Sequence, residues 1–398
     1  GYGDFNARKR AKNFTEEELR LVAEFARRNG RKIYITVNTL VFDRELPAFL
    51  HLCELIREIR ADAVIVQDLG AFSLLREQFP EIPLHASTQM FCHNSLHAEF
   101  LKKQGAARVI LPRELSLREI EMIKDRVPME YEVFIHGAMC FSFSGCCLAS
   151  SWLHGDSGNR GICRQACRYS FRKIPGIRPE KREYFPKTSG KELHPFSMRD
   201  LNGLEFVKEL ARIGISALKI EGRMKNAEYV FKTVSAYRDM LDSIREGRPP
   251  AGLPEIPFQR EAASGYFPGE ADYRRLVRLE ASGAAGEVFG KVLSVSAHEI
   301  RIAVPGKFSK GMRLRVQDSK GRNLCEETLL DYTRISEKDL DVLVWKLRKA
   351  VNAAGFTPPY TVYSPGRSAP ADTLRFLKNQ VRKIAVDTLK IEVEINPG

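Results

Sequence analysis

Four cysteines in one segment have the residue type and the spacing of a metal-cluster site. Six residues separate Cys140 from Cys147, fifteen separate Cys147 from Cys163, and three separate Cys163 from Cys167. Thiolates are soft ligands, so four of them suit an iron–sulfur cluster or a structural zinc ion. Zinc modules usually contain two close cysteine pairs, about two to four residues apart. The first interval here is longer, so the spacing favours the cluster.

Two neighbouring features leave other interpretations open. His136 and His154 could supply nitrogen to a zinc site, and Cys146 lies directly beside Cys147, so the choice of ligand in that pair is not absolute. Buried free thiols are a third interpretation. Eight cysteines in 398 residues are too few for a disulfide scaffold, and no leader is visible. We therefore expect a protein of the reducing cytoplasm.

A second group of reactive side chains ends an apolar run at residues 218–223. Lys219 and Glu221 share one face there, because side chains alternate along a strand. Burying them is costly unless they pair or bind a ligand. A structural ion pair is one interpretation. The other is a substrate or anion site, formed with Arg113, Arg199 and Arg223.

Polar side chains also end the other apolar runs, among them Asn38, Gln67 and Gln89. Each could be a helix cap or a loop residue, but their recurrence is typical of a barrel whose active site collects residues from many strands. His85 and His136 also lie at strand ends and could act as general bases, although His85 is equally well explained as a core histidine. No hydrolase motif with a paired nucleophile and base is present.

Short apolar runs alternate with amphipathic stretches from residue 15 to about 235, which predicts strand–helix units around a parallel sheet. No Gly-rich dinucleotide fingerprint follows any strand, so we predict an α/β fold of the TIM-like barrel type. A complete barrel has eight strands, and the chain opens at Gly1-Tyr2-Gly3 like the end of a strand. We therefore expect that an N-terminal strand–helix–strand is missing. The predicted strands are Ile33–Leu40, Ala63–Leu69, Leu84–Met90, Arg108–Leu111, Tyr131–Ile135 and Ala217–Ile220, with a seventh at Phe196–Leu201.

The predicted domains follow from changes in composition along the chain. Residues 1–245 form the barrel, with a Cys-rich insertion at 138–195, and the Pro-rich stretch 246–285 is a linker. Short β-rich runs broken by Gly and Lys predict a small β-barrel module at 286–355. Residues 356–398 are predicted to be a C-terminal helical tail.

The charge of the chain favours a polyanionic partner. Sixty-three Lys and Arg against 50 Asp and Glu give a net charge of +13. Between 168 and 191 the basic residues are interleaved with Tyr169, Phe171, Tyr184 and Phe185, which suits phosphate contact and base stacking. A solvated, basic insertion loop is the alternative. No apolar run reaches the length of a membrane span, so no membrane partner is predicted.

The motifs resemble those of peptidase family U-32. The matching stretches are Glu132-x-Phe134-Ile135-His136-Gly137-Ala138-Met139-Cys140, Ser144-Gly145-Cys146-Cys147-Leu148-Ala149-Ser150, Asn159-Arg160-Gly161-x-Cys163-x-x-x-Cys167-Arg168 and Leu218-Lys219-Ile220-Glu221-Gly222-Arg223-Met224-Lys225. Phe5-Asn6-Ala7-Arg8 and His85-Ala86-Ser87-Thr88-Gln89 are also similar. The resemblance covers about residues 1–280, and the later β module resembles the family's C-terminal module. Cys146 departs from the family pattern, and the family's opening strand is absent.

The resemblance implies an enzyme. Better-understood members are oxygen-independent hydroxylases of tRNA wobble uridine, of a cytidine in 23S ribosomal RNA, or of ubiquinone precursors. It implies a 4Fe–4S cluster on Cys140, Cys147, Cys163 and Cys167, and prephenate as the small-molecule hydroxyl-group donor. With the strand-end residues, it gives these predicted roles: catalytic for His136, Lys219, Glu221 and Arg223; substrate-binding for Arg8, Asn38, Gln67, His85, Gln89, Arg113 and Arg199.

Other functions remain open at this stage. The family was named for collagenase-like proteolysis, and ubiquinone-pathway members pair with a second member, so a protease and a subunit of a hydroxylase pair are alternatives. A homo- or heterodimer is consistent with each. Residues 360–389 are similar to the end of longer ribosomal-type members, whereas the chain length suits the tRNA type. Both RNA targets therefore remain open.

Overall fold

The apolar runs predicted as strands form a parallel sheet in a computed structural model of the chain. In it, β1 to β5 pair in chain order, and β7 pairs with β5; all of these pairings are parallel. All four residues of β2 are buried, as expected for parallel strands covered on both faces. These strands are β1 (Tyr34–Val37), β2 (Ala63–Val66), β3 (Leu84–Ala86), β4 (Ala106–Ile110), β5 (Glu130–Ala138) and β7 (Ala217–Ile220).

The structure describes most of the chain. The described residues are 2–9, 13–171, 193–222, 225, 227–250, 260–269, 272–279, 287–304, 313–317, 323–337, 340–354 and 361–364.

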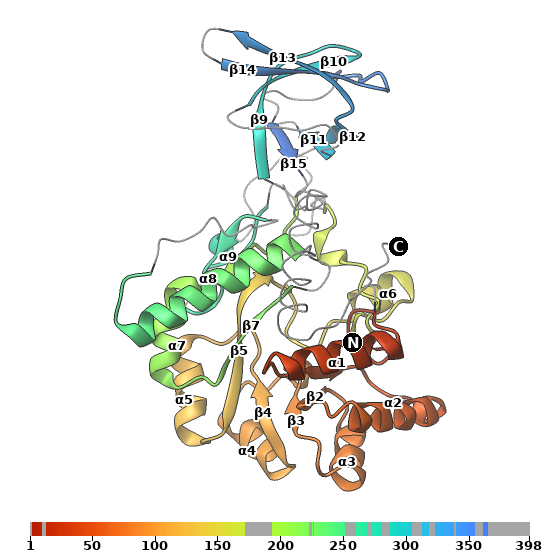
Figure 1. Ribbon diagram of the computed structural model, residues 1–398, viewed down its shortest axis with the longest axis vertical. Coiled ribbons are helices and arrows are strands. Elements are labelled where there is room, and N and C mark those ends of the chain that lie inside the picture. Colours follow the sequence, from red (N-terminus) through yellow and green to blue (C-terminus); the bar gives the residue numbers. More distant parts are fainter. Residues whose placement is uncertain are drawn as a thin grey trace, which may run out of the picture. The chain divides into compact units, whose positions relative to one another are not determined.

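Helices connect the parallel strands, and α2 to α5 follow one another along the outer side of the sheet (Figure 1). A capping box of Thr15 and Glu18 begins α1. A second capping box, of Ser116 and Glu119, begins α5 directly after the loop that carries Arg113. The helices are α1 (Glu16–Arg28), α2 (Leu46–Glu58), α3 (Leu69–Gln78), α4 (Ser95–Lys103), α5 (Leu117–Arg126), α6 (Ala149–His154), α7 (Val207–Ile213), α8 (Ala227–Glu246) and α9 (Tyr273–Leu276).

The predicted barrel is not confirmed. The seventh strand lies at β6 (Asp200–Asn202) and runs antiparallel to β5, with His136 opposite Asn202. The short β8 (Ala262–Ala263) then pairs with β6. Within the residues that the structure describes, β1 pairs only with β2 and β7 only with β5, so the sheet remains open.

The second unit is an antiparallel β module with its own core. Its strands pair in the order β12-β11-β15-β9-β10-β14-β13, and β9 to β14 lie within the module predicted at 286–355. A closed barrel is again not confirmed among the described residues. The bounds are β9 (Glu287–Val295), β10 (Glu299–Ala303), β11 (Arg313–Gln317), β12 (Asn323–Thr328), β13 (Asp331–Glu337), β14 (Leu340–Lys346) and β15 (Thr361–Ser364).

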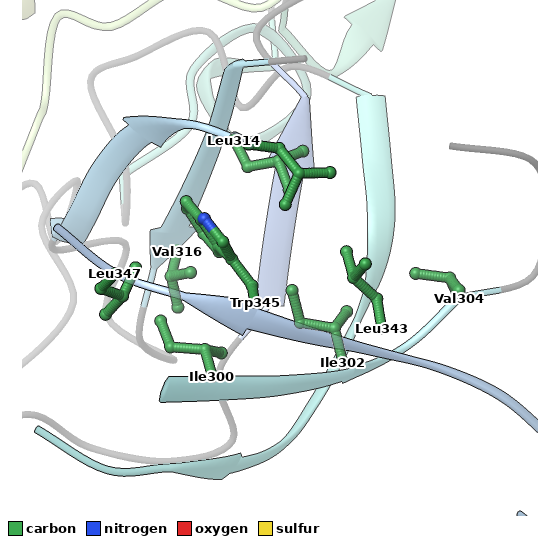
Figure 2. Close-up of a cluster of buried hydrophobic side chains, with 9 residues drawn as sticks. Ile300, Ile302, Val304, Leu314, Val316, Leu343, Trp345 and Leu347 are labelled. Carbon is green, nitrogen blue, oxygen red and sulfur yellow. The ribbon is translucent and has the colours of Figure 1, made fainter. Parts of the chain in front are cut away.

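Trp345 lies in the centre of this module's core (Figure 2). Trp345 pairs across the strands with Ile300, and Leu343 pairs with Ile302. All four side chains are fully buried. Because alternate residues of β10 and β14 face the same side, their apolar side chains form one continuous layer.

Two domain predictions meet the structure differently. Residues 260–279, inside the predicted linker, contain β8 and α9 and belong to the first unit. The prediction of a linker therefore differs from the structure at 260–279. A Pro-rich composition does not reveal short elements that are held by pairing with distant residues. The predicted C-terminal helical tail at 356–398 is wrong at Thr361–Ser364, which form the strand β15 between β9 and β11, because pairing with distant strands decides the structure there. Residues 355–360 and 365–398 lie outside the described residues. No helix in the described part of the chain is long and apolar enough to span a membrane.

Candidate functional site

Charged side chains from three strands pair with one another inside the first unit. Glu132 of β5 accepts hydrogen bonds from Lys219 of β7 at 2.6 Å and from Arg108 of β4 at 3.2 Å. Arg108 also donates to the more exposed Glu130 at 2.7 Å. Burial raises the pKa of Glu132, but the positive charges of Lys219 and Arg108 outweigh burial and hold it below its usual value. The network is therefore charged and fully paired.

Glu221 forms the second charged centre, one residue beyond β7. Its carboxylate accepts from Arg113 at 3.0 Å and from Arg8 at 3.4 Å. Burial raises its pKa, whereas Arg8, Arg113 and Lys219 together hold it below the usual value. The Arg113 guanidinium also lies 3.8 Å from the ring centre of Phe134, a cation–π contact that fixes its position. The Arg8 side chain is 41% exposed, so this guanidinium is accessible to an anion.

The loops after β1 and β3 come together beside this centre. Gln89 donates from Nε2 to the Asn38 carbonyl at 2.6 Å, and the Asn38 side chain accepts from the Ala7 amide at 3.0 Å. Ala7 immediately precedes Arg8. Gln67 is buried, and its Oε1 has no hydrogen-bond partner among the described residues. A buried acceptor without a partner is costly, so Gln67 is suited to a ligand donor.

The two candidate general bases have different surroundings. His85 is buried against Tyr34, and burial together with Arg108 lowers its pKa to about 4. His136 lies after a bulge in β5 and pairs with Ile220, so it faces the side opposite Lys219 and Glu221. Its Nδ1 lies 3.3 Å from the Tyr237 hydroxyl, which donates to the Ile135 carbonyl. The His136 carbonyl accepts from the Glu221 amide at 2.9 Å, so the main chain of β5 is attached to the residue that follows β7.

The four predicted cluster thiols are gathered in one region. Burial raises the pKa of Cys167 to about 11, and the charges of Cys140, Cys163 and Cys147 raise it further while Arg168 lowers it. Cys140 is exposed as a residue, yet its thiol is desolvated enough to raise its pKa, with Cys147 and Cys163 adding to the effect. The thiol of Cys147 is thus a neighbour of both Cys140 and Cys167.

The donor set fits an iron–sulfur cluster in chemistry and number, because four soft thiol donors share one segment. Across the described residues, no three His, Cys, Asp or Glu side chains are grouped closely enough to hold a metal ion as they stand.

Hydrogen bonds attach the cysteine segment, residues 138–168, to the loops at the strand ends. Ser144 donates from its amide to Glu114 at 2.7 Å. Arg160 donates to Glu45 at 2.8 Å and to the Leu40 carbonyl, and stacks over Phe42. These contacts place the segment above the loops that follow β1 and β4.

Arg168 attaches the other end of the segment. Its guanidinium donates to the Met139 carbonyl at 3.0 Å and to the Ser197 hydroxyl at 2.9 Å. Cys167 is therefore held beside the start of the segment, next to Cys140.

Arg113 connects the two candidate sites. It pairs with Glu221, and its positive charge lowers the pKa of the Cys140 thiol. The Glu221 centre and the Cys140 thiol are therefore near neighbours at the carboxyl ends of the strands.

Two predicted site residues fall elsewhere. Arg199 pairs with Glu261 at 2.8 Å, and Arg223 lies outside the described residues. Arg108 and Glu132 were not predicted as site residues, although both carry charge inside an apolar run that is otherwise typical of a buried strand. A buried charge in such a run was the available signal.

The sequence matches the model of Peptidase family U32 over residues 1–275. The chain belongs to this family.

Three relatives show the range of names in the family. An uncharacterized protease of Methanocaldococcus jannaschii is 40% identical over 62% of this chain and 60% of its own length. The tRNA hydroxylation protein P of Escherichia coli is 32% identical over 63% of this chain and 64% of its own. The 23S rRNA 5-hydroxycytidine synthase of E. coli is 34% identical over 78% of this chain and 48% of its own. The chain thus spans less than two thirds of each relative.

Proposed function

We propose that this protein is an iron–sulfur-dependent, oxygen-independent RNA hydroxylase. Its product would be 5-hydroxyuridine at the tRNA wobble position or 5-hydroxycytidine in 23S ribosomal RNA. The observation that carries the proposal is the position of Arg113, which pairs with Glu221 and acts on the Cys140 thiol. A donor held by Arg113 would therefore lie next to the thiol ligands. Two relatives are named for tRNA and ribosomal RNA hydroxylation, and the net charge of +13 suits an RNA partner.

The proposed donor is prephenate, a dicarboxylate. Arginine guanidinium groups recognise carboxylates through paired hydrogen bonds. Arg8 is the accessible guanidinium of the Glu221 centre, while the buried Gln67 offers a polar group without a partner among the described residues. In this proposal Arg8 and Arg113 bind the donor carboxylates. Glu221 holds the two guanidinium groups in position. The positive charge of Lys219, which Glu132 holds by a hydrogen bond, helps to keep Glu221 ionised.

The proposed cofactor is a 4Fe–4S cluster on Cys140, Cys147, Cys163 and Cys167. When bound, such a cluster supplies a redox-active iron centre with soft ligands. Arg113 and Arg168 would balance part of its negative charge, because both already act on these thiols.

Anaerobic purification and spectroscopy test the cofactor. We expect a brown protein that absorbs near ~400 nm, with about four irons and four sulfides per chain. Cys147→Ser should remove most of the iron, whereas Cys146→Ser should retain it, because the family motif assigns Cys147 to the cluster and Cys147 lies near Cys140 and Cys167. A wild-type protein that holds no iron after anaerobic reconstitution would refute the cluster.

An RNA assay tests the reaction. The reconstituted protein, prephenate and RNA from cells lacking the modification are incubated without oxygen, and nucleosides are identified by mass spectrometry. We expect a 5-hydroxypyrimidine that depends on prephenate and disappears in Arg113→Met. Hydroxylation of tRNA but not of ribosomal RNA, or the reverse, would identify the target.

Proteolysis is the second candidate because one relative carries a protease name. Gelatin cleavage that survives Cys140→Ser would support a protease that does not need the cluster. A stable complex with a second family member that binds no RNA would instead support a subunit of a hydroxylase pair.

A further inference from the structure

Two glycines occupy equivalent places before two of the cysteines. Gly145 precedes Cys147 by two residues, and Gly161 precedes Cys163 by two. Their φ angles are +81° and +82°, in the left-handed region that residues with a side chain rarely adopt. Both belong to the cysteine segment, one in each half.

Gly145 lies against the backbone of the loop after β3. A Cβ atom added at Gly145 would lie 2.2 Å from the carbonyl oxygen of Gln89 and 2.9 Å from its carbonyl carbon. Real contacts are not this short, and a backbone carbonyl cannot rotate away as a side chain can. The same Gln89 holds the Asn38 carbonyl through its side chain.

Gly161 makes the same kind of contact with the N-terminal loop. A Cβ atom there would lie 2.4 Å from the carbonyl oxygen of Asn6 and 2.9 Å from the amide nitrogen of Lys9. Those two residues flank the stretch that carries Arg8, which pairs with Glu221. Each half of the cysteine segment is therefore in backbone contact with a loop of the charged centre.

We infer that Gly145 and Gly161 are positioning residues that fix the thiols relative to the donor-binding loops. The inference rests on the proposed function for the identity of the two ligands. Any side chain at either glycine must push the segment away from its loop. The displacement moves Cys147 or Cys163 on one side and Gln89 or Arg8 on the other. The same contacts would transmit a displacement of the thiols to the donor-binding loops, and any resulting coupling of metal and donor binding would be reciprocal.

A third glycine of the same segment provides the matched control. Gly155 also has a positive φ, +70°, but no atom lies within 4 Å of a Cβ added there. Gly155→Ala therefore introduces similar backbone strain without a steric contact. A difference between the variants isolates the close approach from the strain.

The experiment compares Gly145→Ala and Gly161→Ala with Gly155→Ala in the full chain. Iron and sulfide are measured after anaerobic reconstitution, and prephenate binding to the metal-free protein is measured by calorimetry. We expect the two positioning variants to lose about tenfold in iron affinity and to bind prephenate more weakly. Gly155→Ala should match wild type in both, and far-UV circular dichroism verifies folding of all three.

Amide hydrogen exchange gives a readout that does not depend on iron. Exchange at residues 87–91 should rise in Gly145→Ala, and exchange at 6–9 should rise in Gly161→Ala. Cadmium, which binds thiols, should slow exchange at both 87–91 and 6–9 in the wild-type protein. This measurement tests the inference even if a glycine variant does not fold. Equal iron loading and equal exchange in Gly145→Ala and Gly155→Ala would overturn the inference. Failure of the wild type to bind iron or prephenate would instead refute the proposed function, and the exchange data would still decide the inference.

Discussion

Glu132 is a buried carboxylate that pairs with two cations of neighbouring strands. It is buried between Lys219 and Arg108, while Glu130 makes a comparable hydrogen bond to the same arginine from an exposed position. The two carboxylates differ in burial, so the loss of each should change the free energy of unfolding by a different amount. A buried charge that loses its partner is not compensated by water, whereas an exposed one is.

Glu132→Gln should therefore destabilise the fold by about 3–5 kcal/mol, because it leaves Lys219 and Arg108 without their buried counter-charge. Glu130→Gln, the control, should cost less than about 1 kcal/mol, because this side chain is 55% exposed. Urea unfolding followed by circular dichroism measures both. Equal costs would show that the buried network does not support the sheet.

His85 should give the protein a pH-dependent stability. Its pKa in the fold is about 4, below the ordinary value of 6.5, so the unfolded chain binds a proton first as the pH falls. Stability is then lost between pH 6.5 and 4, by at most about 1.4 kcal/mol per pH unit. The free energy of unfolding, measured from pH 7 to pH 5, should lose part of this slope in His85→Asn. The exposed His51 serves as the control, and an unchanged slope in His85→Asn would contradict the prediction.

At the scale of elements, the cysteine segment depends on its contacts with the strand-end loops. Arg160 reaches out of the segment to Glu45, whose pKa this contact lowers to about 2. Arg164 instead pairs with Asp156 inside the segment. Replacing Arg160 thus tests the attachment of the segment, and replacing Arg164 tests a contact within it.

Arg160→Met should accelerate amide exchange at residues 157–163 by about tenfold, as expected for lost charged hydrogen bonds worth about 1.5 kcal/mol. Arg164→Met should leave exchange in the loop around Glu45 unchanged. Hydrogen-exchange mass spectrometry measures both. Equal effects on that loop would mean that Arg160 is not an attachment point.

The elements with strong local signals could be predicted from the sequence. The capping box of α1 and the apolar alternation of the module strands are short-range patterns, and the structure confirms them. The antiparallel course of β6 could not be predicted, because a three-residue strand takes its direction from its partner. The bulge that turns His136 toward Tyr237 likewise depends on the pairing register of β5 with β7.

The candidate site was predicted in part for a similar reason. Arg113, Glu221, Asn38 and Gln89 lie together as residues that follow strands should, and Arg8 joins them from the N-terminal loop. The pairing of Arg199 with Glu261 depends on residues far apart in sequence. Spacing along the chain cannot reveal such a contact.

For the whole molecule, the two tryptophans report on different units. Trp345 is fully buried in the β module, and Trp152 is 86% exposed in the cysteine segment. Replacing Trp152 with Phe leaves emission from Trp345 alone, so fluorescence follows the module while far-UV circular dichroism mainly follows the helices of the first unit.

In that background, Leu343→Ala should destabilise the module by about 2–5 kcal/mol, because it opens a cavity in a fully buried core. Leu293→Ala, at a residue 49% exposed, should change stability by less than about 0.5 kcal/mol. We expect the fluorescence midpoint in urea to fall in Leu343→Ala while the helical signal keeps its midpoint, because each unit has its own core. A common shift of both signals would indicate a single cooperative unit.

The close approach of Gly145 and Gly161 to neighbouring backbone also restricts how this segment can evolve. Any substitution of a glycine adds a Cβ atom. Neither Gly145 nor Gly161 can therefore be replaced conservatively. The cysteine segment and the loops at 6–9 and 87–91 must then keep complementary backbone shapes as the sequence changes. A chimera that exchanges the segment between distant relatives should fold its thiols correctly only when those two loops are transferred with it.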